Sequence, residues 1–471
     1  MRPRFFLLAS AFFFGFTVNA QTQWSLQDCI NYAITNNVSV KGADLQKRLA
    51  TLTFEQSKAS FLPSFRFSGS SGYRFGLSEN PTTGTMQSNN FFNTGFSLSG
   101  GINLFSWFAK HHQLKATIAD LEANDIGVQK VRNDVAMIVS TSYLQAILAK
   151  EMINLAIIQV QQSVIQKETT EKKAKLGVLS QLDVSQVRQQ QLADTLSLLT
   201  AEATYEKTMI QLKAVLALDA DFILELKAIP LNDESAKFLL ELKPETFFAS
   251  AVKKLPQVKG IQLQTEAVKE RIKAVKSERY PSFSIFGSTG SSFIDIPSPQ
   301  AYSFLPLQPT GAKVQVNGVS YDVMAPTYRG SNYSVTPFFR QIHKNLGQNV
   351  GISISIPILN GKTSLINQKR EEINLNQLKF QTQRIYQELK TAIFSAYVDA
   401  KFAFNKTELS RKVLNEAIKV HEAAQKKYAL NLLSTQDLLI ATNNLVKTKE
   451  GVLVAEFELA LRINVLRFYC E

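Results

Sequence analysis

The sequence predicts a mixed α+β membrane protein in which each chain contributes four β-strands to a shared barrel and pairs of long helices to a coiled-coil sheath. Three observations predict this fold class. The chain contains an internal duplication, its strand-like segments alternate between apolar and small polar residues, and its helical segments are far longer than those of ordinary globular domains.

Two sets of residues recur along the chain at constant offsets, 218 and 254 positions. The first set is Lys41, Gly42, Pro63, Ser64 and Phe65, which recur as Lys259, Gly260, Pro281, Ser282 and Phe283. The second set is Ile102, Leu104, Ser180 and Asp183, which recur as Ile356, Ile358, Ser434 and Asp437. The second copy therefore carries 36 extra residues between its two strands. Each repeat is one strand–strand–helix unit.

The duplication sets the expected boundaries: 1–20 signal peptide, 21–217 first repeat, 218–246 equatorial linker and 247–471 second repeat. Arg2 and Arg4 precede a short apolar run, and Val18-Asn19-Ala20 has the small residues of a cleavage site. The run is too short for a membrane anchor, and we expect no apolar run long enough for a transmembrane helix in the rest of the chain.

Four segments, about 64–75, 93–105, 282–292 and 347–358, alternate with a period of two and are expected to be strands. Phe65 and Phe67 flank Arg66, for example, and the polar positions are mostly Ser and Gly. A small polar face suits the wet interior of a membrane barrel, with lipid outside. The alternative is a half-buried strand of a soluble sandwich, but Phe105 and Trp107 favour a membrane interface.

Four strands cannot close a barrel, and lipid does not tolerate an open edge. The barrel must therefore be shared between chains. Three chains supply twelve strands, within the range of membrane barrels, whereas the eight strands of two chains leave an interior filled by side chains. We therefore predict a homotrimer.

Long helices are expected at about 108–176, 181–217, 362–430 and 435–468. Two rows of uncharged residues repeat every seven positions, which predicts coiled-coil packing. Large residues near the strands give way to small ones farther away, which favours a tapering sheath over an ordinary two-helix coiled coil. The rows are Leu114, Leu121, Val128, Val135, Ser142, Ala149, Ala156, Ser163 and Thr170, and Gln368, Leu375, Thr382, Leu389, Ala396, Ala403, Ser410, Ala417 and Ala424.

Each pair of long helices is joined by a short reversal. Gly177 and Asn431 tolerate the left-handed conformation that ends many helices. Ser180 and Ser434 are expected to cap the returning helices, with Asp183 and Asp437 three residues on.

Two irregular segments complete the expected fold. The linker breaks the helical pattern and should form a small waist with residues 24–37 and the end of the chain. The long loop at 290–346 should contain a hairpin over 314–321 with an Asn317-Gly318 turn, and should face outside the cell.

The whole mature chain resembles the TolC family of outer-membrane efflux proteins, also called outer membrane factors. The matching features, in doubled order, are the signal peptide, residues 28–37 before a helix, Leu62-Pro63-Ser64, Tyr280-Pro281-Ser282, and finally Tyr428, Asn431, Ser434 and Asp437. The resemblance implies a homotrimer whose twelve-stranded barrel is continuous with a long α-helical tunnel. It also implies a passive duct in the outer membrane, in contact with its lipid, with the tunnel in the periplasm. A periplasmic membrane-fusion adaptor and an inner-membrane RND, ABC or MFS transporter would open it, and no cofactor is implied.

The resemblance also assigns roles to particular residues. Asp183 and Tyr428 match a linked pair that closes the tunnel, and Asp437 matches a ring of aspartates at its narrowest point. Ile440 and Leu433 stand where the family has a second aspartate and an arginine, so the gate would be looser. The adaptor is expected to dock on the two tips, which are Gly177, Val178, Leu179, Ser180, Asn431, Leu432, Leu433 and Ser434.

Other function classes find less support. The adjacent His111 and His112 cannot share one helix face, no phosphate loop or nucleophile motif occurs, and we expect neither an enzyme nor a metal site. The net charge of +13 is spread along solvated helix faces, without a nucleic-acid motif. A trimeric coiled-coil surface protein would explain the helices but not the strands. Drug or metal efflux and type I protein secretion stay open, as do a Cys29–Cys470 disulfide and two buried thiols.

Overall fold

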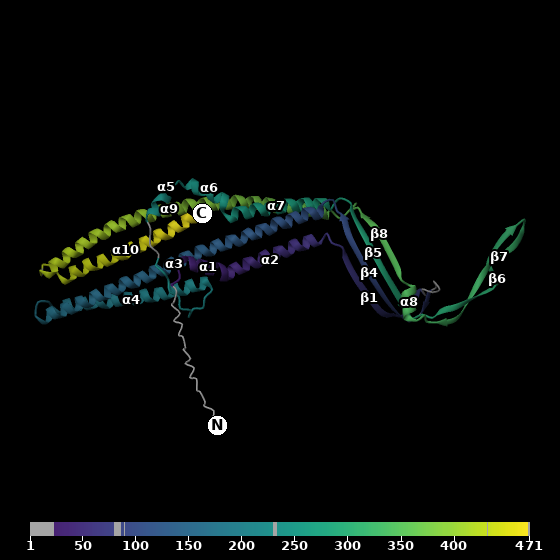
Figure 1. The fold of residues 1–471 in the computed structure, drawn as a ribbon, viewed down its shortest axis with the longest axis horizontal. Coiled ribbons are helices and arrows are strands. Elements are labelled where there is room, and N and C mark those ends of the chain that lie inside the picture. The colour runs from purple at the N-terminus through teal and green to yellow at the C-terminus, as the bar shows by residue number, and fades with distance from the viewer. Residues whose placement is uncertain (1–22, 80–85, 89, 229–232, 431, 470–471) are drawn as a thin grey trace, which may run out of the picture. The chain divides into compact units, whose positions relative to one another are not determined.

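The structure is a computed structural model that describes residues 23–79, 86–88, 90–228, 233–430 and 432–469 (Figure 1). The expected signal peptide, Asn431 and Cys470 lie outside these ranges. The chain divides into two compact units. The strand unit comprises Leu52–Ile118 and Ala267–Leu375, and the helical unit comprises the remainder, so each unit draws on both repeats.

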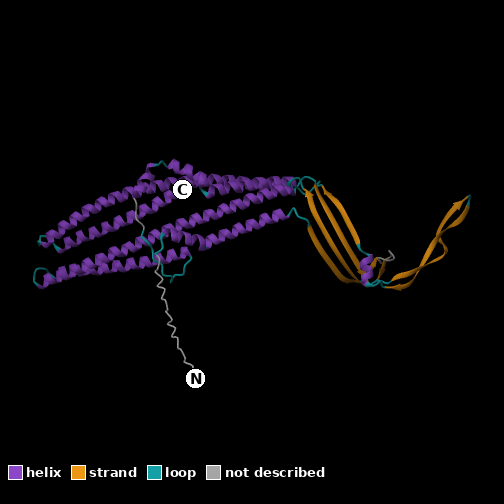
Figure 2. Cartoon of the chain, viewed as in Figure 1, coloured by secondary structure: helices purple, strands orange, loops and turns teal. Residues whose placement is uncertain are grey.

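Four antiparallel strands form the main sheet of the strand unit, in the order β1-β4-β5-β8. They are β1 (Ser64–Arg74), β4 (Phe91–Phe105), β5 (Ser282–Ile294) and β8 (Gly347–Ser355), each within three residues of its expected range. The β4–β5 pair joins the two repeats, and the outer edges of β1 and β8 have no strand partner among the described residues. Figure 2 shows the four strands side by side.

The strand register gives this sheet two different faces. Cross-strand neighbours share a face, so the alternation of each strand adds up across the sheet. One face is apolar and its outer side chains are exposed, and the other is mostly Ser, Asn and Gly. The apolar face consists of Phe65, Phe67, Phe96, Leu98, Ile102, Phe283, Ile285, Val350, Ile352 and Ile354.

Aromatic rings cover glycines on neighbouring strands. Phe65 lies opposite Gly100, and a Cβ on that glycine would meet the ring at 2.5 Å. Phe286 lies opposite Gly351 in the same way, at 2.8 Å. Such pairs restore the packing that a glycine strand lacks and help to fix the register.

Two hairpins form separate two-stranded sheets. The short one consists of β2 (Leu77–Glu79) and β3 (Met86–Ser88), and the long one consists of β6 (Ser298–Val316) and β7 (Val319–Ser334), followed by α8 (Phe338–Lys344). Asn317 and Gly318 turn the long hairpin with φ of 49° and 82°, as the Asn-Gly turn predicted. The hairpin is much longer than the predicted 314–321, because the register continues through two irregularities to Ser298 and Ser334.

The first repeat contains helices α1 (Leu26–Asn36), α2 (Val38–Ala59), α3 (Ala109–Lys175) and α4 (Gln181–Leu216). Next along the chain come α5 (Asp233–Glu241), α6 (Pro244–Lys254) and α7 (Pro256–Ser277), then α9 (Thr363–Ala429) and α10 (Thr435–Phe468). The residues of both heptad rows are buried or half-buried, so the predicted packing stripe is confirmed. Ala403 is 1% exposed and Thr170 is fully buried.

Both strand-to-helix junctions contain two successive residues with positive φ. Trp107 and Phe108 have φ of 51° and 65°, and Gly361 and Lys362, 254 positions later, both have φ of 62°. Two successive left-handed residues are costly for side chains as large as tryptophan. Trp107 is held by stacking on Tyr280, with ring centroids 5.2 Å apart.

The expected waist consists of two apolar clusters in the helical unit. In the first, Trp24 pairs with Leu226, and the Tyr143 hydroxyl lies 2.9 Å and 2.5 Å from the carbonyl oxygens of Trp24 and Lys227. In the second, Phe247 packs with the C-terminal Phe468 and Tyr469. The N-terminal segment packs in the first cluster together with Phe457 of α10, and the last described residues of α10 pack in the second.

One described helix, α3, contains an 18-residue window that is apolar enough to cross a membrane, with a mean hydropathy of 1.2. This differs from the expectation of no such run. The window is a candidate membrane span by its length and composition only, and 33% of it is buried within the chain.

Candidate functional site: the helix reversals and the seam between them

The first reversal is built as its sequence predicted. Gly177 has φ +76°, and the Val178 and Gly177 amides donate to the carbonyls of Lys173 and Ala174, at 3.0 Å each. This pair of bonds is the Schellman pattern that ends many helices. Ser180 and Asp183 then form a capping box, in which the Asp183 amide donates to the Ser180 hydroxyl and the Ser180 amide donates to the Asp183 carboxylate.

The second reversal has nearly the same bonds. The Leu432 amide donates to the Lys427 carbonyl at 2.8 Å, which is the Schellman bond that spans six residues. Ser434 caps α10, because the Asp437 amide donates to its hydroxyl at 3.1 Å, and the hydroxyl donates to the Asp437 carboxylate at 2.6 Å. Both serine caps are therefore confirmed, while Asn431 lies outside the described residues.

The tips expose large apolar side chains to solvent. Val178 and Leu432 are exposed, whereas Leu179 and Leu433 are half-buried. Three further leucines that sequence reasoning did not select are also exposed at the tips: Leu176, Leu182 and Leu430. Their signal was present in the sequence, since a leucine beside a helix reversal has few neighbours to cover it.

The expected Asp183–Tyr428 link is not made within one chain. The Ser180 hydroxyl, and after it the Thr435 hydroxyl of α10, hold the pKa of Asp183 below its usual value. The Tyr428 hydroxyl is buried without a hydrogen-bond partner in the part of the chain that the structure describes. Lys173 lies 4.8 Å from the centre of the Tyr428 ring. The pair stays a prediction for the assembled protein.

Asp437 is exposed at the tip and is bonded to Ser434, so it does cap its helix. Ile440 is also exposed. Leu433, where the family has an arginine, packs beside Tyr428 and Leu438 in a small apolar cluster. Apolar packing thus occupies the place where the resemblance implies a charge.

A polar seam lies between the two helix pairs, above the tips. Asn443 of α10 donates to Gln190 of α4 at 2.9 Å, and Gln190 donates to Asp194 at 2.8 Å. Gln159 of α3 lies 3.5 Å from the other oxygen of Asp194, which is 6% exposed. The seam therefore contains a buried carboxylate that is satisfied by amides alone.

A cavity of about 400 Å³ accompanies this seam, and His421 and Tyr428 line it together with Asp194. Burial, with Lys449 nearby, lowers the pKa of His421. Sequence reasoning missed the seam. The sequence offers one indication of the seam, which is that Asp194 has no basic residue three or four positions away with which to form an ion pair along its helix.

Cys29 is the one cysteine among the described residues, and Cys470 lies outside them. Cys29 is fully buried in the first waist cluster, and burial raises the pKa of its thiol to about 12. Tyr469, the neighbour of Cys470, packs in the second cluster. The disulfide stays a prediction, and alkylation in denaturant without reductant tests it. Two reactive thiols would exclude the bond.

His112 has a structural partner. Its Nδ1 lies 2.7 Å from Glu270 of α7, and Lys273 lies 2.6 Å from the other oxygen of that carboxylate. These neighbours link α3 to α7 within the strand unit.

The two-faced sheet with free edges and the very long helices with capped reversals together characterise the fold of this chain. Several solved structures share this fold. CusC aligns with a TM-score of 0.73 at 15% identity, over 96% of this chain and 92% of that chain. VceC of Vibrio cholerae aligns at 0.70 and 13% identity, over 94% and 96%. The Campylobacter jejuni CmeC outer membrane channel aligns at 0.66 and 16% identity, over 94% and 85%.

The match to a family model lies in the first repeat. Residues 29–218 match the family described as Outer membrane efflux protein. The expected resemblance to TolC-like outer-membrane efflux proteins is thereby confirmed, and the match supports an outer-membrane location. No curated protein sequence matches the chain.

Proposed function

We propose that three copies of this chain form a passive exit duct through the outer membrane. The observation that carries the proposal is the sheet β1-β4-β5-β8, which has one exposed apolar face, one small polar face and two free edges. In lipid every backbone amide needs a partner, so these edges must pair. Pairing β8 of one copy with β1 of the next closes a barrel without a further element.

The helical unit supports the same assembly. Five large side chains of α9 are exposed in the single chain and lie along one stripe with an 11-residue repeat. A repeat of this length keeps residues on one face of a long helix. The stripe is Val398, Phe402, Leu409, Val413 and Val420. We assign it to contacts with a neighbouring copy.

Native mass spectrometry of the detergent-solubilised protein tests the stoichiometry, and planar-bilayer recording tests the channel. We expect a trimer that conducts ions. Phe402→Ser should weaken the trimer, whereas Glu408→Ser, at an exposed residue of α9 outside the stripe, serves as the control. A single chain that conducts by itself would refute the argument from the free edges.

The gate is assigned to the tips. Three Asp437 carboxylates around one axis would attract cations and repel anions. Tyr428 would have to turn out of its buried position to bond to Asp183 of a neighbouring copy. With Leu433 and Ile440 in place of charged residues, the gate has one acidic ring.

We assign the tips Gly177–Ser180 and Asn431–Ser434 to docking of a periplasmic adaptor, which would couple the duct to an inner-membrane RND, ABC or MFS transporter. The exposed leucines support this assignment, because they give a partner apolar surface to bury. Gly177→Arg would block docking but also strain a left-handed residue, so Leu432→Glu is the cleaner test. The Leu432→Glu substitution should abolish export without changing the abundance of the trimer.

The matched control is Gln181→Glu, which adds the same charge at a tip but leaves the leucines in place. Normal export by the Leu432→Glu variant would remove the tips from the docking surface. The nature of the cargo, a small compound or a secreted protein, is a separate question, and transport assays with an inner-membrane RND pump or an ABC transporter would distinguish efflux from type I secretion.

A further inference from the structure

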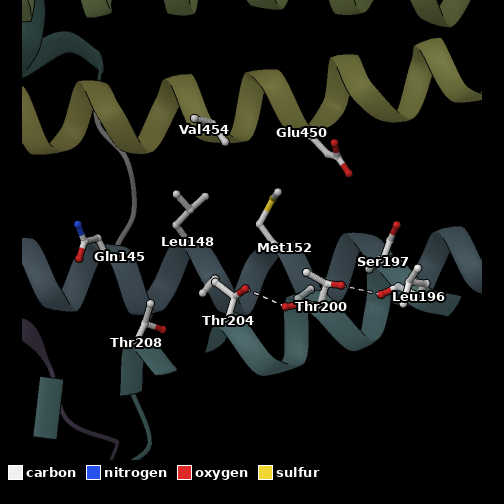
Figure 3. Close-up of a pocket in the computed structure, with 13 residues that line it drawn as sticks. Gln145, Leu148, Met152, Leu196, Ser197, Thr200, Thr204, Thr208, Glu450 and Val454 are labelled. Carbon is white, nitrogen blue, oxygen red and sulfur yellow. Dashed lines mark hydrogen bonds between the residues drawn. The ribbon is translucent and has the colours of Figure 1, made fainter. Parts of the chain in front are cut away.

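The largest cavity described in the helical unit lies between three helices of different repeats. It has a volume of about 600 Å³ and is lined by α3, α4 and α10. This volume is typical of sites for small organic ligands. Figure 3 shows Leu148 and Met152 of α3 pointing toward α10, with the threonines of α4 beside them. The wall of α3 is therefore apolar.

The hydroxyls of α4 offer oxygen acceptors but no free protons. Thr200 donates its hydroxyl proton to the Leu196 carbonyl at 2.9 Å, and Thr204 donates to the Thr200 carbonyl at 2.8 Å (Figure 3). Thr208 and Ser197 donate to the carbonyls of Tyr205 and Ala193 in the same way. Since a hydroxyl has one proton and two lone pairs, each oxygen can still accept a hydrogen bond from a ligand.

One charged side chain lines the cavity, and it is an acid. Glu450 of α10 is half-buried and has no ion-pair partner among the described residues. Lysine and arginine are absent from the lining residues that the structure describes. Gln145, at the wall of α3, supplies the amide donors. The site thus combines an apolar floor, several acceptors and one negative charge.

We propose that this cavity binds an organic cation with an apolar body. Leu148, Met152 and the methyl groups of the threonines would cover the body, and Glu450 would lie beside the positive charge. An anion of the same shape would meet the carboxylate and the hydroxyl lone pairs, so the cavity would reject it. The proposal deepens the proposed function and rests on it, because it names a class of compound as candidate cargo of the duct.

The test uses two probes of nearly equal shape and opposite charge, tetraphenylphosphonium and tetraphenylborate. Binding to the purified full-length protein in amphipol is measured by equilibrium dialysis. The cation should bind better than the anion. Glu450→Gln should weaken its binding about tenfold, as expected for the loss of a partly buried charge interaction of about 1.4 kcal/mol. Ala201→Leu should also weaken it, because the larger side chain fills the cavity.

Glu202→Gln is the matched control, since Glu202 is exposed on α4 beside the cavity without lining it, and binding should be unchanged. The proposal is overturned if both probes bind equally, if Glu450→Gln and Ala201→Leu bind the cation like the parent protein, or if a neighbouring copy covers the cavity so that neither probe binds. Native mass spectrometry and conductance of the same samples separate such a result from failure of the proposed function, because a conducting trimer without a cation site contradicts only this inference.

Discussion

The hydrogen bond between Asn443 and Gln190 is expected to stabilise the closed state of the duct relative to the open state. It joins the side chains of α10 and α4 across the seam between the helix pairs. If the helix pairs separate when the duct opens, Asn443→Ala removes a bond that exists only in the closed state. The variant should therefore raise the open fraction.

The size of the effect follows from the bond and from the number of copies. An exposed amide–amide bond contributes about 0.5–1 kcal/mol. Three copies in a trimer would contribute about 1.5–3 kcal/mol, and since 1.4 kcal/mol is a factor of ten, the open-to-closed ratio should rise about 10- to 100-fold. Planar-bilayer recording of the open probability measures this ratio.

Asn444→Ala is the matched control, because Asn444 is the next residue of α10 and its side chain has no described bond across the seam. Adding Asn443→Ala to Gln190→Ala should change the open fraction little further, since Gln190→Ala already removes this bond, together with the bond from Gln190 to Asp194. Equal open probabilities for Asn443→Ala and Asn444→Ala, with normal trimer abundance, would refute the idea that opening breaks this seam.

Three further outcomes are expected. Asp437→Ala should reduce cation selectivity and block by polyvalent cations, whereas Asp183→Ala should mostly destabilise the closed state; a loss of thermal stability without any change in selectivity would leave Asp437 as a helix cap alone. Gly290→Ala should destabilise the sheet by about 1–3 kcal/mol, because its Cβ would lie 2.9 Å from the Phe96 carbonyl oxygen. Gly287→Ala on the same strand meets ordinary contacts and should be neutral. Equal midpoint temperatures of the heat-induced change in gel mobility for the two variants would contradict this. The pKa of Asp183 is lowered in the folded chain, so its contribution to stability should be present above its unfolded pKa of about 3.9 and be lost as the pH falls through the lower folded value. Acid titration of a fluorescent label attached at the tip would detect this loss.

Local patterns in the sequence were enough to predict most of the elements. Strand alternation, the long helices and the Asn317-Gly318 turn depend on backbone preferences and on one-dimensional periodicity, which are encoded within a few residues of each other. The capping pairs at Ser180 and Ser434 were predictable for the same reason, because a cap uses residues only three positions apart. The division of the helices and strands between repeats also followed from the duplication.

Contacts between distant segments could not be predicted in this way. The bond from Asn443 to Gln190, the burial of Asp194 and the cavity beside Glu450 each require helices from different repeats to lie together. Their polar residues have no local pattern that distinguishes a seam from a solvated helix face. The sequence by itself therefore determined the elements, the doubled order and the capped reversals. The tertiary structure decided which polar residues become buried and what lies opposite them, because burial is a property of the packed helices and not of any one segment.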